Sequence, residues 1–463
     1  MVDVSIATNS ESGVQLTDQT VQEFKSSLRG ALLVPDDAGY DAARSLFNSM
    51  IDRRPALIAR CEGAGDVIAC VNFARDHDLS FSIKAGGHNV AGLALVDNGL
   101  MIDLTLMNSV QVDEANRTGR VEGGATWGDF DKETQAFGLA TTGGIATTTG
   151  IAGLTLGGGI GYLNRKYGLA CDNLISADVV TADGELRTAS KDSNPDLFWA
   201  IRGGGGNFGV VTSFEFQLHP VGPLFGGVLA WPLPLAKDVL RFYRDFSSTA
   251  PDELRLDAVI QTTPDGPGLG IVVSWCGTIE EGERVIQPLR EFMSPVLDTL
   301  DSMPYSVLQG LIESEGVVAG SLNYWKSSFA RQISDELIDT LVDRFPSTPS
   351  EKTAIVFEQL GGAISRIGDQ ETAFSHRQAQ YAVLILSFWD DPVDNEKNIE
   401  WTRSLFSSIE PLMDGGVYSN YMMEDEGESR LRQAYGVNYD RLVEIKRKYD
   451  PSNMFRHNQN IKP

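Results

Sequence analysis

The chain has 463 residues and a formal net charge of −25, from 63 acidic and 38 basic residues; this length is typical of two or three domains. Hydrophobic residues make up 42% and charged residues 22%, which is typical of a globular protein and excludes intrinsic disorder. The acidic charge argues against binding to nucleic acid or to an anionic membrane surface, and the absence of a long apolar run or a secretory pattern in residues 1–20 predicts a cytoplasmic protein without a membrane partner.

The four cysteines, Cys61, Cys70, Cys171 and Cys276, form no C-x-x-C pair. Zinc sites and thioredoxin-like sites need that spacing, and no set of His, Asp or Glu residues shows metal-ligand spacing either. We therefore expect no metal. The cysteines are expected to be reduced and mostly buried, with a Cys61–Cys70 bridge as the alternative.

The first 140 residues predict short helices and strands. Apolar spacing indicates a helix over 41–51, a buried strand over 55–60, a helix that begins at an Asp66 N-cap and ends at Arg75, and a strand over 79–83. Residues 99–104, 110–113 and 119–122 predict a meander of three strands with Asp, Asn and Gly turns, and a helix follows over 127–137.

Residues 174–218 contain a second group of predicted elements. Strands over 174–181 and 186–189 flank Asp183-Gly184, a strong hairpin signal. A short helix is expected over 195–201, and the alternating residues 209–218 predict a half-buried strand.

After Pro220 glycine becomes less frequent and longer elements alternate, which suggests a second domain from about 220 to 424. The predicted strands cover 227–231, 254–262, 270–277, 353–360 and 381–389, and the predicted helices cover 236–247, 282–293, 335–344 and 396–409. A single amphipathic helix is expected over 429–449, before Asp450-Pro451.

Three glycine-rich segments lie within residues 84–209: 84–92, 141–161 and 202–209. Glycine lets backbone N–H groups converge on an anion and lets the chain approach a ligand closely. One such segment is usually a tight turn, but three together predict loops around a pyrophosphate. Neither a Rossmann nor a Walker pattern is present, so a dinucleotide would bind in another way.

These segments resemble the flavoprotein oxidases of the vanillyl-alcohol oxidase superfamily. The resemblance lies in Gly86-Gly87-His88-Asn89, in residues 157–169, in 196–200 with 207–212, and in the closing segment 438–461, which is similar to that of berberine-bridge-enzyme-like proteins. It covers nearly the whole chain and is weakest over 225–350. It implies an α+β, two-domain PCMH-type fold with bound FAD. An FAD-binding domain, 1–220 with 425–463 returning to it, would accompany a substrate-binding domain, 221–424, built on a large antiparallel sheet covered by helices.

The resemblance implies that His88 is joined covalently to the flavin 8α-methyl carbon. A neutral imidazole nitrogen is a competent nucleophile near neutral pH, whereas the alternative is a solvated loop histidine. Many relatives add a cysteinyl link, but Ala146 occupies that position, so a single histidyl link is expected, as in the 6-hydroxynicotine-oxidase-like and enterocin-flavoenzyme-like bacterial members. Lys84 stands where many relatives have arginine and keeps the charge without the bidentate fork.

The remaining cofactor-binding residues implied by the resemblance lie in the glycine-rich loops, the 209–218 strand and the tail. They are Ala85, Gly86, Gly87, Asn89, Gly92, Gly143, Gly144, Thr148, Thr149, Gly150, Gly153, Leu154, Gly158, Gly159, Gly161, Asn207, Gly209, Val210, Val211 and Asn458. Thr149 and Leu154 match positions near the flavin N5, although a capped turn and a core leucine are the alternatives. Val210 and Val211 match a strand beside the adenine and could equally be ordinary core.

Three residues are candidates for catalysis: Glu358, Tyr421 and Thr149. If Phe357 and Gln359 share one face of their strand, Glu358 lies on the other face among apolar residues, where a carboxylate is either functional or at a strand edge. Tyr421 matches a segment beside the active site and is either a base or a packed aromatic. His376-Arg377 could bind an anionic group or form a surface pair.

The expected function is that of an FAD-dependent oxidase with a small-molecule substrate and O2 as partners. A small organic alcohol or amine would pass a hydride to flavin N5, and O2 would reoxidise the flavin to give H2O2. The alternatives are a flavin-dependent dehydrogenase, an oxygenating tailoring enzyme of secondary metabolism in which the flavin carries oxygen at N5, and a flavin-binding protein without turnover. A monomer and a homodimer both fit the sequence.

Overall fold

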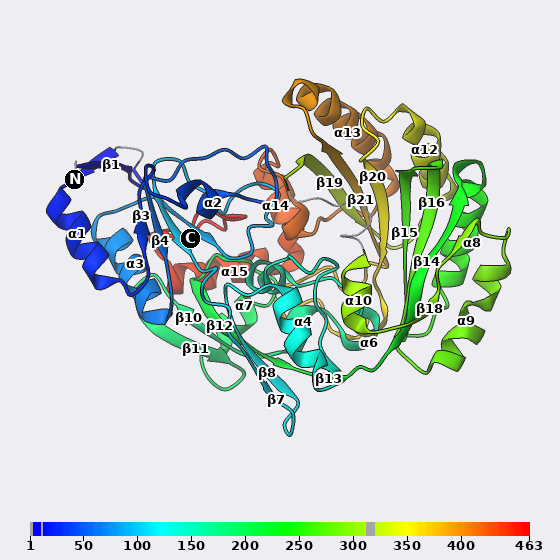
Figure 1. The fold of residues 1–463 in the computed structure, drawn as a ribbon, viewed down its shortest axis with the longest axis horizontal. Helices are drawn as coiled ribbons and strands as arrows, with labels where there is room; N and C mark the ends of the chain where they lie inside the picture. The colour runs from blue at the N-terminus through cyan, green and yellow to red at the C-terminus, as the bar shows by residue number, and fades with distance from the viewer. Residues whose placement is uncertain (1–2, 11–12, 312–319) are drawn as a thin grey trace.

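The computed structural model describes residues 3–10, 13–311 and 320–463 and combines helices with five sheets in that part of the chain (Figure 1). This agrees with the expected α+β class. No helix among these residues is both long and apolar enough to cross a membrane.

The N-terminal half contains two main sheets. The first has the order β3 (Leu32–Leu33), β4 (Leu57–Arg60), β6 (Leu100–Asp103), β5 (Phe81–Lys84), and β4 and β5 run parallel to β6. The second is antiparallel, with the order β11 (Leu186–Ser190), β10 (Leu174–Val180), β12 (Val210–Gln217), β8 (Thr118–Glu122), β7 (Val110–Asp113). Two further pairs are β1 (Val4–Ala7) with β2 (Gly13–Leu16), and β9 (Leu139–Ala140) with β13 (His219–Pro220).

Seven helices pack around these sheets. They are α1 (Asp18–Ser27), α2 (Tyr40–Arg44), α3 (Ala64–Asp76), α4 (Trp127–Gln135), α5 (Ile151–Gly157), α6 (Asn164–Tyr167) and α7 (Pro195–Ala200). The C-terminal helices α14 (Glu428–Tyr435) and α15 (Tyr439–Tyr449) return to this half, where Leu442 and Ile445 of α15 join the same apolar core as Phe198 and Trp199 of α7.

The eight-stranded antiparallel sheet forms the other half of the molecule (Figure 1). Its order is β17 (Leu297–Asp298), β14 (Leu224–Pro232), β16 (Gly266–Trp275), β15 (Leu254–Thr263), β20 (Ala354–Gln359), β21 (Tyr381–Trp389), β19 (Leu322–Ala330), and β18 (Asp301–Met303) also pairs with β14. Helices α8 (Ala236–Ser247), α9 (Ile279–Glu291), α12 (Asp335–Arg344) and α13 (Asn395–Ile409) cover its outer face, and the short α10 (Tyr305–Gln309) lies on the inner side.

The alternation of side chains along the strands explains this packing. Leu256, Ala258 and Ile260 of β15 face the core beneath the outer helices, whereas Val259 faces inward. β21 reads YAVLILSFW, a nearly continuous apolar run, because both of its faces are buried. The strands and helices predicted between 227 and 409 are confirmed within a few residues, including α8, α12 and β21 at both ends.

Several predictions for the N-terminal half are wrong in detail. The three-stranded meander does not exist, because β6 joins a parallel sheet while β7 and β8 form a hairpin in the other sheet. Asp66 is not an N-cap: α3 follows Gly63, and the Asp66 carboxylate accepts hydrogen bonds from the backbone N–H groups of Arg29, Gly30 and Glu62. Local sequence does not reveal this role, because Arg29 and Gly30 lie more than 30 residues from Asp66 in the chain.

Two predicted helices differ in extent. The 41–51 helix is limited to α2, which ends at Arg44. The 429–449 helix is two helices, because Gly436 adopts a left-handed backbone with φ of 49° between α14 and α15. Strand β19 was not predicted, although it is nine residues long. All four cysteines are buried, as predicted, and the structure forms no disulfide between Cys61 and Cys70, whose sulfurs lie 3.9 Å apart.

A buried ion pair anchors the end of the chain. Lys446 and Asp450 lie 2.7 Å apart with both side chains 0% exposed. The Lys446 ammonium also donates to the carbonyl oxygens of Asn207 and Phe455, while Asp450 accepts from the N–H groups of Met454 and Phe455. These bonds fix the tail 451–461 against the N-terminal half.

Replacing Lys446 by methionine should therefore destabilise the protein by about 3 kcal/mol, because removal of one partner leaves a buried charge uncompensated. Lys448→Met is the matched control: Lys448 pairs with Asp196 at 2.6 Å but its side chain is 58% exposed, so the loss should stay below about 1 kcal/mol. Denaturant unfolding measures the change in unfolding free energy of both variants. Equal losses would contradict the conclusion that the buried Lys446–Asp450 pair anchors the tail.

Candidate active site

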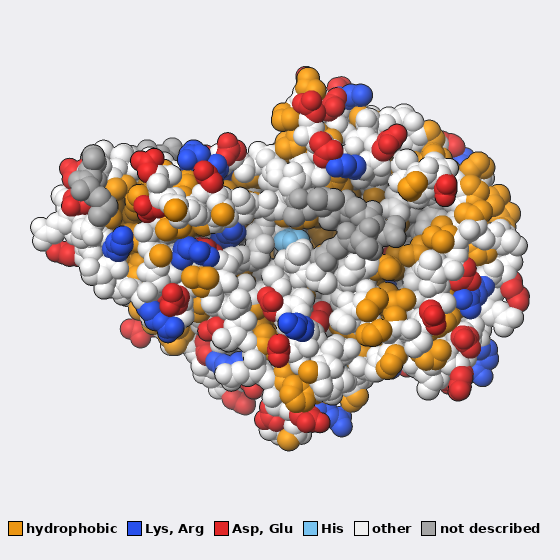
Figure 2. Space-filling view, in the orientation of Figure 1, with side chains coloured by type: hydrophobic (Ala, Val, Ile, Leu, Met, Phe, Trp, Pro, Cys, Tyr) orange, Lys and Arg blue, Asp and Glu red, His pale blue; other side chains and the backbone are white. Residues whose placement is uncertain are grey.

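A cavity of about 610 Å³ lies between the glycine-rich loops of the N-terminal half and the inner face of the eight-stranded sheet. On the face shown in Figure 2 the surface is hollowed between the two halves, and acidic and basic side chains are interspersed. The cavity is the natural candidate for a ligand site because its volume falls in the usual range of ligand pockets, roughly 300–1,000 Å³.

The floor of the cavity is made by two glycine-containing turns in close contact. A Cβ atom on Gly86, which follows β5, would lie 2.4 Å from the backbone nitrogen of Gly150, and one on Gly150 would lie 2.5 Å from the nitrogen of Gly86. Only glycine fits at either position. The backbone N–H groups of Gly86, Gly87 and Asn89 form no hydrogen bond within the described residues, so they are available to a ligand.

Gly86→Ala should lower stability by about 3 kcal/mol, since the new methyl group meets backbone atoms that cannot rotate away. Gly65→Ala in the first turn of α3 provides the comparison, because no heavy atom lies within 4 Å of its would-be Cβ. Thermal unfolding should show a clear fall for the first variant and none for the second. A Gly86→Ala protein of native stability would mean that the two turns are not in contact.

His88 lines the cavity and is held from two sides. Its ring stacks on Phe47 with centroids 4.6 Å apart and planes 21° apart, and its Nδ1 lies 3.4 Å from the Thr149 hydroxyl oxygen. Phe47 follows α2, and Thr149 precedes α5, so three separate segments meet at this imidazole. This arrangement fixes the ring against the cavity wall.

The structure brings most of the predicted cofactor residues to this cavity. Those lining it are Ala85, Gly86, Gly87, His88, Asn89, Thr148, Thr149, Gly150, Gly153, Leu154, Gly209, Val210, Val211 and Asn458, together with Ala146. Those outside the lining are Lys84, Gly92, Gly143, Gly144, Gly158, Gly159, Gly161 and Asn207.

Several residues outside the lining have structural contacts. The Lys84 ammonium donates to the carbonyl oxygen of Ala43, and burial lowers its pKa. The Asn207 side chain ties the tail down, donating to Gln459 O at 3.1 Å and accepting from the Ile461 N–H at 2.9 Å.

A buried acidic group forms the polar end of the cavity. Glu358 of β20 is 1% exposed, and the Tyr421 hydroxyl donates to its two carboxylate oxygens at 3.0 and 3.2 Å. Burial raises the pKa of Glu358 to about 7, against the lowering effect of nearby Arg255. Burial also raises the pKa of Tyr421, so the tyrosine stays a hydrogen-bond donor.

Arg255 and Asp257 of β15 lie beside Glu358 and were not predicted. Arg255 Nε donates to both oxygens of Asp257, at 3.0 and 2.9 Å, whereas its Nη2 stays 3.9 Å from Glu358. All three side chains are almost fully buried. The sequence did carry a signal: two charged residues at alternate positions share one face of a predicted strand whose other face is apolar.

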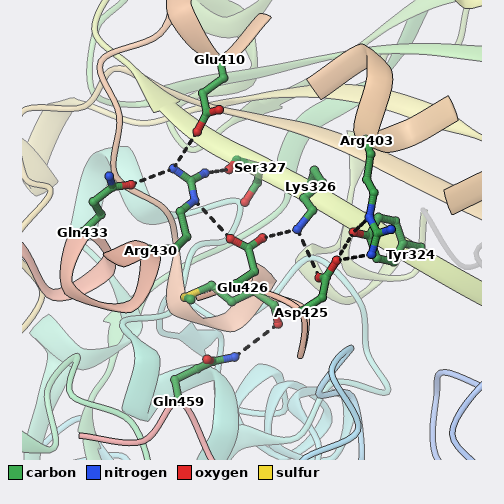
Figure 3. A network of polar contacts seen from close by, with 11 residues as sticks. Tyr324, Lys326, Ser327, Arg403, Glu410, Asp425, Glu426, Arg430, Gln433 and Gln459 are labelled. Atoms are coloured by element: carbon green, nitrogen blue, oxygen red, sulfur yellow. Dashed lines mark hydrogen bonds and ion pairs between the residues drawn. The ribbon is translucent and has the colours of Figure 1, made fainter. Parts of the chain in front are cut away.

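The segment that carries Tyr421 is held against β19 by a polar network (Figure 3). Lys326 of β19 binds Asp425 at 3.2 Å and Glu426 at 2.9 Å, and the Tyr324 hydroxyl donates to Asp425 at 2.6 Å. Arg430 bridges Glu426 and the Ser327 carbonyl oxygen, and Gln459 of the tail donates to Met422 O at 3.3 Å. The network therefore positions Tyr421 relative to both β19 and the tail.

His376 and Arg377 do not reach the cavity. Arg377 is 0% exposed and forms two hydrogen bonds with Asp172, at 2.7 and 2.8 Å. His376 Nε2 contacts the carbonyl oxygens of Gln433 and Ala434. The predicted anion-binding role is not supported, because Asp172 of the N-terminal half already neutralises Arg377. The surface-pair alternative is wrong for Arg377, because its side chain is fully buried.

Comparison with known proteins adds an independent result. An FAD binding domain model matches residues 55–190, and a model described as berberine and berberine like matches 417–462. An FAD-linked oxidoreductase of Dictyostelium discoideum is 34% identical over 448 residues, covering 96% of this chain and 97% of that protein. The (R)-6-hydroxynicotine oxidase of Paenarthrobacter nicotinovorans is 34% identical over 456 residues, covering 94% and 97%.

Among solved structures, 6-hydroxy-D-nicotine oxidase from Arthrobacter nicotinovorans superposes with a TM-score of 0.87 at 33% identity and covers 94% of this chain and 98% of that one. The two family models cover the glycine-rich segments 84–92 and 141–161 and the segment that carries Tyr421, and the two relatives align with 94% or more of the chain. The chain therefore belongs to the berberine-bridge-enzyme-like family of FAD-linked oxidoreductases.

Proposed function

We infer that the protein is an FAD-dependent oxidase of a small organic alcohol or amine, with O2 as the final electron acceptor. One observation carries this most directly: Glu358, a buried carboxyl with a pKa of about 7, shares a cavity with the glycine-rich loops and with His88. A general base works best when its pKa lies near the operating pH. When bound, FAD supplies the hydride acceptor and the site of reaction with O2.

The residues of the cavity fit FAD in three respects. The N–H groups of Gly86, Gly87 and Asn89 have no partner among the described residues and suit a pyrophosphate. The buried Asn458 Oδ1 also has no hydrogen-bond partner, although the side chain lines the cavity. Val210 and Val211 offer an apolar wall for the adenine. We assign FAD binding to the predicted set that lines the cavity, with the remaining glycines and Asn207 as its support.

Within this proposal, His88 forms the only covalent link to the cofactor. Its imidazole lines the cavity and is oriented by Phe47 and by Thr149. Ala146 also lines the cavity, and no cysteine is found among the described lining residues, so a cysteinyl link has no candidate there.

Glu358 would hold the proton that the substrate hydroxyl or amine must lose. Tyr421 donates to both of its oxygens and keeps the carboxylate oriented toward the cavity. Thr149, which contacts His88, would position the neighbouring ring rather than transfer a proton. The buried walls around these groups exclude water from the reacting bond.

We also propose the domain organisation that the sequence predicted. Residues 1–220, with 425–463 returning, would bind FAD, and 221–424 would bind the substrate. The family-model match over 55–190, the packing of α15 against α7, and the position of the eight-stranded sheet across the cavity all support this arrangement.

Aerobic incubation with a panel of amines and alcohols tests the function. The expected result is O2 consumption with matching H2O2 release for at least one substrate class, together with bleaching of the flavin absorption band under anaerobic conditions. Bleaching without peroxide on readmission of air would favour the dehydrogenase alternative. A flavin that dithionite reduces but that no substrate bleaches would contradict an enzymatic role.

A further inference from the structure

Four aromatic rings gather in one corner of the cavity. Phe47, Trp325 and Phe388 contact one another edge to face, with centroids 5.9 to 6.3 Å apart, and Tyr421 meets Trp325 in the same way at 5.9 Å. All four line the cavity. We call these four residues the aromatic corner. Aromatic faces carry negative electrostatic potential and attract organic cations.

The aromatic corner adjoins the carboxylate of Glu358, whose charge is only partly compensated by the nearest cation. That cation, Arg255, donates from Nε to both oxygens of Asp257 and approaches Glu358 only to 3.9 Å. Two carboxyl groups thus share one guanidinium. The one lysine of the described lining, Lys352, is exposed and pairs with Asp390 at 2.6 Å. A positively charged group on a ligand would compensate the remaining negative charge of Glu358.

The sheet side of the cavity combines a large aliphatic surface with a few polar side chains. The aliphatic residues come from five strands and are Val228, Val259, Val272, Ala354, Val356, Leu384 and Leu386, whereas the polar ones on these strands are Asp257, Gln261, Thr262 and Glu358. A sugar placed against the aliphatic surface would leave the hydroxyl groups on that side without hydrogen bonds, which is costly. An apolar ring or chain would instead gain from burial against these residues.

We propose that the substrate is a compact, mostly apolar amine that enters as an ammonium ion, with its cation held between the aromatic corner and Glu358. The Glu358 carboxylate then accepts one N–H proton from the ammonium, giving a carboxylic acid and a neutral amine. The amine lone pair would assist transfer of a hydride from the adjacent carbon to the FAD of the proposed function, so that the amine is oxidised to an iminium ion and the flavin is reduced. For turnover this rests on the proposed oxidase function, but the recognition step does not.

Binding of a cation that cannot be oxidised isolates the recognition step. Benzyltrimethylammonium has no nitrogen lone pair, and neopentylbenzene is its uncharged isostere. Each is titrated into the holoenzyme, below the solubility limit of the hydrocarbon, and followed by perturbation of the flavin band and by tryptophan fluorescence. The cation should bind about tenfold more tightly than the isostere.

Three variants locate the effect. Glu358→Gln and Trp325→Leu should each remove most of the preference for the cation. Glu351→Gln is the matched control, because Glu351 also lines the cavity but is exposed and should leave the preference unchanged. Equal affinity for cation and isostere, or equal losses in the Glu351 and Glu358 variants, would overturn the proposal. Cation binding without turnover of any amine or alcohol would refute the oxidase function and the proton-transfer step, and would leave only the recognition of the cation standing.

Discussion

Acid-denatured wild-type protein should keep its flavin on a gel, whereas His88→Ala should release all of it. The reason is that, among the described lining residues of loop 84–92, the His88 imidazole is the only nucleophile, and Phe47 stacking and Thr149 orient it. The measurement is in-gel flavin fluorescence together with the absorption spectrum of the acid supernatant. The variant should still fold and bind FAD reversibly, since the N–H groups of Gly86, Gly87 and Asn89 are unchanged.

Two further variants test the role of His88 more closely. Thr149→Val removes the hydroxyl beside His88 Nδ1 but leaves the nucleophile, so the flavin should stay attached, with slower formation of the bond. Ala146→Cys places a thiol in the lining and tests whether a second bond can form. Flavin retained by acid-denatured His88→Ala protein would contradict the single histidyl link.

The sequence was most informative where chemistry and periodicity are local. The α8, α12 and β21 bounds followed from apolar spacing, and the glycine-rich segments pointed to a site because their residue type is demanded by close backbone contact, as at Gly86 and Gly150. Strand β6 was misplaced because parallel pairing joins residues far apart in the chain and leaves no local turn signal.

The electrostatics of the site were less accessible from sequence. Glu358 could be singled out as a carboxylate in an apolar strand, but the partition of Arg255 between Asp257 and Glu358 depends on how β15 pairs with β20. The aromatic corner likewise takes Phe47 from the loop after α2 and Trp325 from the unpredicted β19. No spacing within one segment encodes such a meeting of distant side chains.

Replacing Glu358 by glutamine should reduce the rate of flavin reduction by about 10²- to 10⁴-fold, because the variant cannot accept the substrate proton. The pH dependence of flavin reduction identifies the base more specifically than the loss of rate does. Burial raises the pKa of Glu358 to about 7, so the base is mostly protonated at pH 6 and mostly ionised at pH 8. The second-order rate constant of flavin reduction at low substrate concentration, which reports the free enzyme, should therefore rise through pH 7 to a plateau in the wild type, and this inflection should vanish in Glu358→Gln.

Tyr421→Phe should move the same inflection in a predictable direction. The Tyr421 hydroxyl donates to the ionised carboxylate and lowers the pKa of Glu358, so its removal should shift the inflection to higher pH while the plateau rate falls less than in Glu358→Gln. Rapid anaerobic mixing at a series of pH values measures both effects. A Glu358→Gln profile that keeps the inflection near pH 7 would assign the base to another group, and a downward shift in Tyr421→Phe would show that this hydroxyl does not stabilise the ionised form.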